Sequence, residues 1–462
     1  MTVLASPTLA FTLPENAPAR EPAMHMLTRY TGKWTTIYLV LAALPLVAIL
    51  IGGDNARRGF GMEGGVMLGV LALSLMSLQA AFSGRHRQVG PKLGVDNMLQ
   101  FHRRIGTIVL FLVFAHPLWL ISHNPAYLSY FDPRDETLRA LSLNAMLLAI
   151  VVLVCGSLWR KKTGPRYEYW RLLHGGLSVF LVCGGLGHAL MVGHHTHQPL
   201  VAGALILLVG SAVGLLVESR LLRPRRLRKQ PWEITRVTPE RGDATTLTLA
   251  PCGDYAMHFT PGQFAWITVG DTPFSLQQHP FSIASSATRS DEIRMVIKNL
   301  GDFSARAQHL QPGTRAFLEG PYGSFALQQN NRSGVVLIAG GIGITPILSI
   351  LHTFRDQAAD IPLWLIYASA KQSGISCKTE LDELARALPL EITYVLSDPE
   401  EGWEGETGYV DADLIARVVP PDDGLRTYFV CGPAPMMDVV ERALKAHGAT
   451  TTRMFSDRFN LV

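Results

Sequence analysis

The sequence predicts three structural parts: a six-helix transmembrane bundle, a small antiparallel β-barrel and an α/β domain with a doubly wound parallel sheet. The chain has 462 residues, too many for one compact domain. It is 48% hydrophobic, and its long uncharged runs all lie before about residue 220. Short alternating runs follow Pro231, and strand-like and helix-like runs alternate from Val335. We therefore expect a disordered tail over residues 1–30, the bundle over 31–222, the barrel over 231–330 and the α/β domain over 331–462.

The bundle is predicted from six apolar segments that approach the roughly 20 residues needed to cross a bilayer. These segments are Thr35–Gly52, Gly64–Phe82, Ile105–Ser122, Leu141–Trp159, Leu172–Val192 and Leu200–Val217. Basic residues gather after the second, fourth and sixth segments, and the positive-inside rule places these clusters in the cytoplasm. Arg57 and Arg58, after the first segment, are an exception. We expect a plasma or inner membrane protein with both termini and the soluble half on the cytoplasmic side.

The remaining bulk properties exclude several classes of protein. The net charge is only +4, and because the basic residues flank apolar segments we expect no nucleic-acid partner. The five cysteines form no CxxC pair, so we expect neither a zinc site nor a disulfide framework. The first thirty residues hold four prolines and lack the charged start and apolar core of a signal peptide.

The soluble half is predicted from runs of strand-forming residues. Six runs with turn residues between them predict the barrel: WEITRVT, TTLTLAP, QFAWITV, HPFSIASS, EIRMVIK and TRAFLEGP. Five later runs predict the parallel sheet: VVLIA, LWLIYAS, EITYVLS, TYFVCG and RMFSDRF. Helices are expected between them, starting at Pro346, near Glu380–Leu388, near Asp413 and over Pro435–Ala446.

Two apolar segments each carry two histidines fourteen positions apart, His102 with His116 and His174 with His188. Fourteen residues make about four helical turns, so both histidines of a segment face one way, about 21 Å apart along the axis. The two segments enter the membrane from the same side, which matches His102 with His174 in depth and His116 with His188. Facing imidazoles at one depth can occupy both axial positions of a haem iron, and two levels predict two b-type haems.

Any one of these histidines could have an ordinary structural role, because a polar residue in a span can form a hydrogen bond to a neighbouring carbonyl. Four ionisable residues in one register are harder to explain this way, since buried polar groups in a membrane are costly. Three arginines flank the inner pair and are candidate partners for haem propionates, or merely charges in the headgroup region: Arg103, Arg104 and Arg171.

Two motifs of the barrel suggest a flavin site. In HPFSIASS, His279, Pro280, Phe281 and Ser282 combine a flat apolar surface with donors, as a flavin ring requires. In IKNLGDFS, Lys298 adds charge, Gly301 allows close backbone approach, and Ser304 with nearby amides can hold a pyrophosphate. Each motif alone is also compatible with an ordinary barrel strand or turn.

A strand, a glycine turn and a helix follow in VVLIAGGIGITPILSIL, which is the pattern of a phosphate site. We expect Thr345 to cap this helix and Pro346 to occupy its first turn. Gly340, Gly341 and Gly343 form the turn, although Pro346 stands where a GxGxxG motif has its third glycine. The CGP triplet, Cys431, Gly432 and Pro433, ends a later strand at the sheet edge where ligands of such folds bind.

Taken together, these motifs resemble the ferric reductase and NADPH oxidase family of di-haem transmembrane flavocytochromes, over nearly the whole chain after residue 30. The paired histidine segments, HPFS, GPYG, GGIGITP and CGP occur in the family's order. The resemblance implies that Pro280, Phe281 and Ser282 contact FAD, that Lys298, Gly301 and Ser304 lie near its pyrophosphate, and that Gly340, Gly341, Gly343, Thr345, Cys431 and Gly432 bind nicotinamide nucleotide. Ser282, Cys431 and Phe459 are the candidate catalytic residues.

Two departures from the family pattern affect the expected cofactor contacts. An aromatic residue near the C-terminus is expected to cover the flavin, and Phe459 stands two residues further from the end than in eukaryotic oxidases, which leaves Phe455 as a second candidate. Lys371 stands where relatives that prefer NADPH often have arginine, and lysine lacks its bidentate fork. The preference between NADPH and NADH therefore stays open, and Lys371 is equally compatible with an ordinary solvated loop residue.

The predicted function is transmembrane electron transfer from cytoplasmic NAD(P)H through FAD and two haems to an extracytoplasmic acceptor. A ferric chelate would make the protein a ferric reductase, and oxygen a superoxide-producing oxidase. The patterns are also compatible with electron transfer to a quinone or a partner protein, and with a histidine-lined metal transporter that carries an accessory reductase. We favour ferric chelates because Arg134, Arg139 and the histidines His123, His194, His195 and His197 are expected on the outer surface, where the histidines can also bind a metal or simply be solvated.

Overall fold

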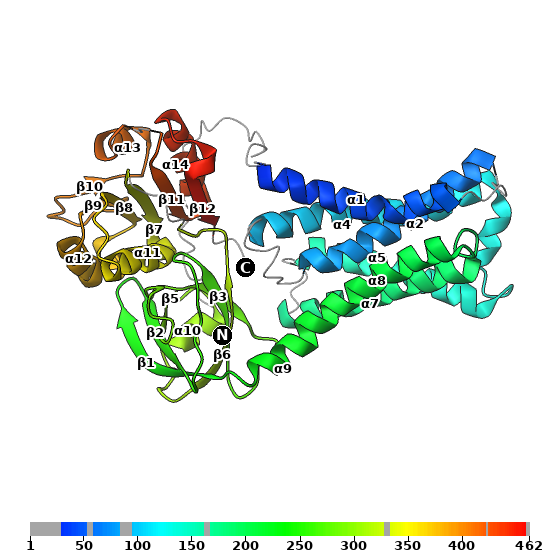
Figure 1. Cartoon of the computed structure of the whole chain (residues 1–462), viewed down its shortest axis with the longest axis horizontal. Coiled ribbons are helices and arrows are strands. Elements are labelled where there is room, and N and C mark those ends of the chain that lie inside the picture. Colours follow the sequence, from blue (N-terminus) through cyan, green and yellow to red (C-terminus); the bar gives the residue numbers. More distant parts are fainter. Residues whose placement is uncertain are drawn as a thin grey trace, which may run out of the picture.

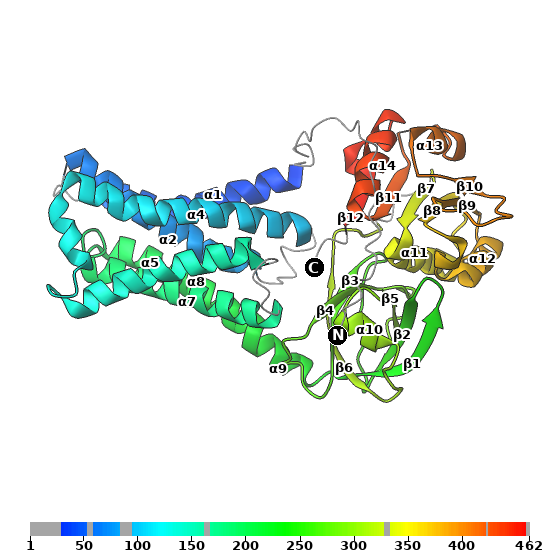
Figure 2. The same ribbon diagram turned by 180° about the vertical axis from the view of Figure 1, so that it is seen from behind.

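The computed structural model describes residues 29–52, 59–83, 95–160, 167–327, 333–421 and 424–458. Of the predicted tail over residues 1–30, only the last two residues lie within these ranges. Phe459 lies outside them. Two soluble units stand at one end of a helical bundle, and both views place them at the same end (Figure 1; Figure 2).

Six helices of the described chain are long and apolar enough to cross a membrane, which confirms the predicted spans. They are α1 (Arg29–Gly52), α2 (Gly59–Ser83), α4 (Val95–His123), α5 (Thr137–Leu158), α7 (Tyr167–Val192) and α8 (Pro199–Val217). The short 3-10 helix η1 (Pro125–Phe131) connects α4 to α5. After α8 the chain continues without a break through a π-helical turn, η2 (Glu218–Leu222), and α9 (Arg223–Leu227), which leads directly to the soluble half.

Glycines on α2 let it approach α4 closely. A Cβ on Gly61 would strike the ring of His123, one on Gly65 would meet Leu120 at 2.5 Å, and one on Gly69 would lie 2.8 Å from the ring of His116. These glycines recur every four residues and so share one face of α2, as small residues do where membrane helices pack tightly. The close contact at this glycine face fixes the position of α4, and therefore of its histidines, relative to α2.

The first soluble unit is a curled antiparallel sheet of six strands, as predicted. The strands are β1 (Trp232–Glu240), β2 (Ala244–Pro251), β3 (Phe264–Val269), β4 (His279–Ser282), β5 (Ile293–Lys298) and β6 (Arg315–Tyr322), in the order β4-β3-β6-β1-β2-β5. The curl brings the two edges together, because the Ala284 N–H, just after β4, donates to the Arg294 carbonyl of β5 at 2.7 Å. A short helix, α10 (Asp302–Ala307), follows β5 and was not predicted.

The second soluble unit is a parallel sheet with helices on both faces, also as predicted. Its strands are β7 (Val335–Gly340), β8 (Leu363–Ser369), β9 (Leu390–Leu396), β10 (Glu406–Thr407), β11 (Thr427–Gly432) and β12 (Met454–Arg458), in the order β10-β9-β8-β7-β11-β12. The helices are α11 (Ile344–Asp356), α12 (Lys378–Ala387), α13 (Ala412–Val418) and α14 (Ala434–Ala446). The two-residue strand β10 was not predicted, since it carries too short a pattern.

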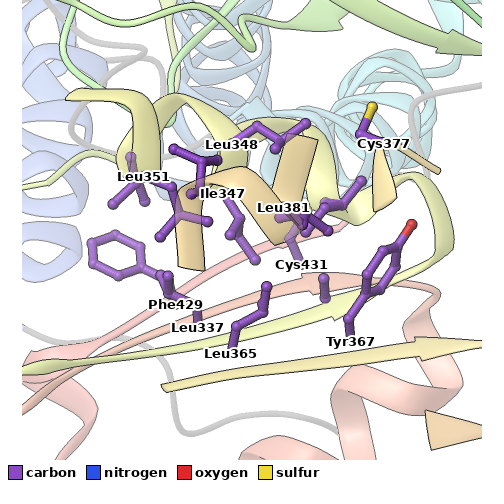
Figure 3. Packing of buried hydrophobic residues seen from close by; sticks show 14 of the residues in the cluster. Leu337, Ile347, Leu348, Leu351, Leu365, Tyr367, Cys377, Leu381, Phe429 and Cys431 are labelled. Carbon is purple, nitrogen blue, oxygen red and sulfur yellow. The ribbon is translucent and has the colours of Figure 1, made fainter. Parts of the chain in front are cut away.

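Alternate residues of the strands point to opposite faces of this sheet and contribute to two cores, one on each face. Leu337 and Leu365 pack against Ile347 and Leu351 of α11 on one face (Figure 3). On the other face Val336 and Ile338 belong to the core that α13 and α14 cover. Burial on both faces explains the nearly continuous apolar runs of these strands.

Two arginines join the bundle to the curled sheet. Arg223, at the start of α9, donates to Glu319 at 2.9 Å and to the Tyr322 hydroxyl at 3.1 Å, both on β6, and is paired with Glu218 at 2.6 Å. Arg171, in the first turns of α7, donates to the Leu276 carbonyl at 2.9 Å in the connection between β3 and β4. The membrane helices therefore hold the sheet at two separate points.

A partly buried ion cluster joins the two soluble units. Glu380, at the start of α12, accepts from Arg294 of β5 at 2.6 and 3.1 Å and from His352 of α11 at 2.7 Å. The Ser349 hydroxyl of α11 also donates to the Ser285 carbonyl at 2.8 Å. Burial alone would raise the pKa of the Glu380 carboxyl, but its bonds to His352 and Arg294 outweigh burial and lower it to about 2.

We predict that Glu380→Gln lowers the free energy of unfolding of the soluble units at pH 7 by about 2 kcal/mol. Because the pKa of Glu380 is lower in the folded state, this stabilisation is complete above about pH 4.5 and is lost as the pH falls towards about 2. Denaturant titrations at neutral and acidic pH measure it, with Glu383→Gln, an exposed carboxylate on the same helix, as control. A destabilisation that does not shrink with acid would contradict the assignment.

Candidate functional site

The four predicted histidines form two facing pairs between α4 and α7. The ring centres of His102 and His174 lie 6.1 Å apart, and those of His116 and His188 lie 6.3 Å apart. An axial imidazole nitrogen lies about 2 Å from its metal and the ring centre about 1 Å behind it, so two axial imidazoles on one iron have ring centres about 6 Å apart. The spacing of both pairs fits this requirement.

Hydrogen bonds set the tautomer of one histidine in each pair. The Nδ1–H of His116 donates to the Gly65 carbonyl at 2.7 Å, which leaves Nε2 with its lone pair. The Ser157 hydroxyl donates to the Leu153 carbonyl at 2.6 Å and lies 3.2 Å from Nδ1 of His174. Since its proton is engaged, the hydroxyl accepts from Nδ1–H, and Nε2 of His174 is again left to bind a metal. The roles of Gly65 and Ser157 have no local signal in the sequence, because these contacts join residues on different helices.

The surroundings of the pairs suit a large flat group. Gly106, Gly175, Gly176 and Gly187 lie on the two histidine-bearing helices, and a Cβ at any of them would meet nothing within 4 Å. Trp170 lies beside the inner pair, with its ring centre 5.1 Å from that of His174. Open glycine surfaces next to two ligand pairs form the kind of cradle into which a porphyrin fits, so the residues present are compatible with two haems.

The HPFS motif forms β4, at the edge of the curled sheet that faces α7. His279 stacks on Phe303 with ring centres 4.1 Å apart, and Phe281 stacks on the same ring at 5.8 Å. The Ser282 hydroxyl is buried and has no hydrogen-bond partner among the described residues. A buried hydroxyl without a protein partner fits a site whose ligand supplies the partner, as a flavin would.

His279 is neutral at physiological pH, because burial lowers its pKa to about 4. Pro280, the other member of the motif, pairs with Trp266 of β3 in the sheet. An apolar, neutral surface of this kind is suited to a flavin ring.

The predicted pyrophosphate residues lie together after β5. Lys298 ends that strand, and the Ser304 hydroxyl of α10 accepts from the N–H groups of Leu300 and Gly301 at 2.9 and 2.8 Å. Ser304 therefore shapes the turn that begins at Gly301. Its contact with a pyrophosphate stays a prediction.

Glycines of the nucleotide motif lie at the C-terminal edge of the parallel sheet, where β7 and β11 meet. A Cβ on Gly343 would strike the carbonyl of Cys431, and one on Gly340 would lie 2.6 Å from Met436 Sδ. A Cβ on Gly432 would lie 3.1 Å from the Gly340 backbone, and Gly341 has a positive φ of 54°. The strand order reverses at this point, which is where doubly wound sheets bind nucleotides.

The predicted cap of the following helix is wrong. Helix α11 starts one residue before Thr345, with Gly343 as its N-cap, after a 3-10 turn, η3 (Gly341–Gly343). Thr345 is buried inside the first turn with Pro346, and its hydroxyl donates to the Ile342 carbonyl at 2.9 Å. The N-cap of the helix is a glycine because a Cβ at Gly343 would strike the Cys431 carbonyl of β11.

Cys431 and Pro433 end β11 beside this turn. Cys431 is fully buried, and its side chain lies in the core with Leu365 and Tyr367 (Figure 3). Burial raises the pKa of its thiol well above the usual value, so the sulfur stays protonated at neutral pH. Pro433 is the N-cap of α14. A role for Cys431 as a thiolate is therefore disfavoured, and contact with the nucleotide stays a prediction.

The residues proposed for specificity and for covering the flavin differ in their surroundings. Lys371 follows β8 and is exposed, 3.4 Å from a carboxylate oxygen of Asp398. Phe455 stacks on Phe429 with ring centres 5.0 Å apart, and packs against the core of the parallel sheet. Phe459, the preferred candidate, lies outside the described residues.

Comparison with known families agrees with this arrangement. The family "Ferric reductase like transmembrane component" matches residues 68–185, "FAD-binding domain" matches 253–326 and "Oxidoreductase NAD-binding domain" matches 337–442. The chain thus carries a ferric reductase-like transmembrane component followed by FAD-binding and NAD-binding domains. It combines six helices able to cross a membrane with the FAD-binding and NAD-binding domains of oxidoreductases.

Individual relatives are more distant. The chain is 30% identical over 234 residues to the reductase component of propane 2-monooxygenase from Mycolicibacterium goodii, covering 49% of this chain and 66% of that protein. It is 30% identical over 184 residues to NADH-cytochrome b5 reductase 1 from Candida glabrata, covering 39% and 65%. Each alignment spans slightly less than two thirds of the relative. The cytochrome b5 reductase domain of Ulva prolifera nitrate reductase matches with TM-score 0.45 and 20% identity, over 51% of this chain and 98% of that domain.

We predict that Lys371→Ala raises the Michaelis constant for NADPH about twofold to fivefold and leaves that for NADH nearly unchanged, since one exposed ionic contact contributes little. Steady-state reduction of a soluble dye measures both constants. Lys378→Ala, a lysine of the same domain paired with Asp382 on α12, is the control and should change neither. Equal effects of Lys371→Ala on both nucleotides would show that Lys371 does not contact the 2′-phosphate.

Proposed function

We propose that this ferric reductase-like protein transfers electrons from NAD(P)H across the membrane, by way of FAD and two b-type haems, to a ferric chelate on the far side. The observation that carries the proposal is the pairing of four histidines at two levels, with ring centres 6.1 and 6.3 Å apart. His102 and His174 would hold the inner haem, and His116 and His188 the outer one. With imidazole on both faces, neither iron would offer a position for direct binding of a substrate.

The attachment of the curled sheet to α7 supports this route. Arg171, three residues before His174, donates to the carbonyl of Leu276, three residues before β4 begins at His279. The strand proposed to contact the flavin is therefore tied to the helix that carries the inner pair. Arg171 serves this contact in the structure, whereas the sequence suggested a propionate partner.

The cofactors, when bound, supply the conversion of a two-electron hydride donor into single-electron transfers. In the proposal, the residues of the chain position and insulate these groups. Gly340, Gly343 and Gly432 would admit the nucleotide close to the backbone, Ser282 would donate to the flavin ring, and Gly65 and Ser157 would orient the histidines. The role of Ser282 rests on its buried, unpartnered hydroxyl.

The proposed orientation places the two soluble units in the cytoplasm of a plasma or inner membrane. Basic residues support it, because Arg220, Arg223, Arg225 and Arg226 lie where the last helix leaves the bundle towards the curled sheet. The acceptor would then approach from the opposite, extracytoplasmic end, where α2 begins and η1 lies (Figure 1).

One observation favours oxygen as a second candidate acceptor. The Arg134 guanidinium donates three hydrogen bonds of 2.7–3.1 Å to Asp132, and Arg139 is 2.7 Å from Glu136. These carboxylates offset the positive charge that the sequence suggested for attracting anionic chelates. A small neutral acceptor does not need that charge.

We predict that His116→Leu and His188→Leu each remove one haem and abolish transmembrane electron transfer, while NAD(P)H still reduces the flavin. The missing ligand leaves one iron without its second imidazole, and the soluble units are untouched. Haem content, flavin reduction and acceptor reduction are measured separately on purified protein. His123→Leu, on the same helix but outside the pairs, is the control. Two haems still bound in the double variant His116→Leu/His188→Leu would refute the ligand assignment.

The acceptor is tested by assays with and without oxygen on the purified protein supplied with FAD and NAD(P)H. We expect ferrous iron, trapped by a ferrous-specific chelator, to form without oxygen and faster than superoxide forms in air. Superoxide dismutase in the aerobic assay is the control, and it should leave this iron reduction unchanged. Iron reduction that requires oxygen would instead identify superoxide as the reductant and support the oxidase.

A further inference from the structure

A second cluster of metal-binding side chains lies at the end of the bundle away from the soluble units. The Glu63 carboxylate of α2 lies 2.9 Å from Nε2 of His194 through one oxygen and 2.8 Å from Nε2 of His195 through the other. The ligand atoms of the three residues all lie within 4.8 Å of one another. Two imidazoles and one carboxylate are the ligand set of several catalytic zinc and non-haem iron sites.

His194 and His195 lie in the short turn between α7 and α8, and several contacts fix the conformation of this turn. Helix α7 ends at Val192, and Gly193 follows with a positive φ of 67°, the left-handed conformation that favours glycine at a helix end. The Thr196 hydroxyl donates to the Ala189 carbonyl at 2.8 Å, and the Gln198 N–H donates to the His195 carbonyl at 3.1 Å. Pro199 then starts α8. The turn holds both histidines against α2, more than 130 positions away in the chain.

Burial distinguishes this cluster from a solvated group of loop residues. His195 is only 8% exposed, and the side chains of His194 and Glu63 are 11% and 14% exposed. Withdrawing a carboxylate and two imidazoles from water costs free energy, which hydrogen bonding offsets in part and a bound cation would offset further.

Other histidines at this end do not join the cluster. His123 stacks on Trp119 with ring centres 5.3 Å apart, and its Nδ1–H donates to the Trp119 carbonyl at 2.9 Å. Nδ1 of His197 lies 3.0 Å from the Gly193 carbonyl, and the residue is exposed. Of the four outer histidines that the sequence offered as a possible metal site, the structure brings two together, and it adds Glu63, which lies far from them in the sequence.

We propose that Glu63, His194 and His195 bind one divalent first-row transition metal ion. Metal–nitrogen and metal–oxygen bonds of about 2.0–2.2 Å require donor atoms slightly further apart than the present hydrogen bonds. Small rotations of the three side chains are therefore enough to admit the ion. Three protein ligands leave coordination positions open to water or to an exogenous ligand.

The site adjoins the outer histidine pair. His194 follows His188 by six positions, and the four helical steps from His188 to Val192 span about 6 Å along the axis of α7. Glu63 is two positions before Gly65, whose carbonyl accepts from His116. The proposed ion therefore lies just beyond the outer pair, at the end of the bundle where the acceptor is expected. Metal binding itself does not depend on the proposed electron transfer, and it is measured without NAD(P)H.

The test uses full-length protein purified without a polyhistidine tag, stripped with a chelator and titrated with Co²⁺ or Zn²⁺. We expect one ion per chain in the wild type, seen as Co²⁺ absorption and as retained Zn²⁺ in elemental analysis. His195→Ala and Glu63→Gln should each weaken binding at least about tenfold, because even residues that only support ligands have effects of this size. His123→Ala, the matched control, should bind as the wild type does.

A second readout keeps the test valid if the alanine variant folds poorly. Saturating Zn²⁺ should raise the unfolding temperature of the wild type and of His123→Ala, but not that of Glu63→Gln, which preserves the side-chain shape. Equal metal affinity in the wild type and in Glu63→Gln would overturn the proposal. Loss of stability in the variants with no metal effect in the wild type would also overturn it, because the cluster would then be only a hydrogen-bonded tie between helices.

Discussion

The common register of α4 and α7 is the constraint on which the rest of the structure depends. Each helix carries two histidines fourteen positions apart, so a single alignment of the two helices brings both pairs together at once. A shift of one residue, about 1.5 Å of rise and 100° of rotation, would disrupt both pairs. Glycines on α2 fix the position of α4, and hydrogen bonds donated by His116 to the Gly65 carbonyl and by His174 to the Ser157 hydroxyl orient one ring in each pair.

The same helices also position the soluble units. Arg171 and Arg223 tie the curled sheet to the bundle at two points, one close to His174 and one at the end of the last membrane helix. The Glu380 cluster and the bond from Ser349 then tie the curled sheet to the parallel sheet. Defined polar contacts thus link the glycine turn before α11, the HPFS strand and the inner histidine pair. The proposed electron transfer requires sites that are fixed relative to one another.

The sequence predicted most of the architecture, because the elements have strong local patterns. Six apolar spans, alternating barrel strands and buried parallel strands were all found as expected. Features without a local pattern were missed, such as the two-residue strand β10 and the short helix α10. Thr345 was wrongly expected as a helix cap, since the choice between it and Gly343 depends on how closely β11 approaches. The contacts of Glu63, Ser157 and Arg171 join segments far apart in the chain, and no spacing in one sequence specifies them.

The central claim, that paired histidines hold two haems at two levels, is tested most directly by the cofactor stoichiometry and spectrum of the purified wild-type protein. The account predicts two haems per bound FAD, both low-spin because each iron has imidazole on both faces, and reduction of both by NAD(P)H. A single haem per FAD, or a high-spin haem with an open coordination position, would contradict the pairing of His102 with His174 and of His116 with His188.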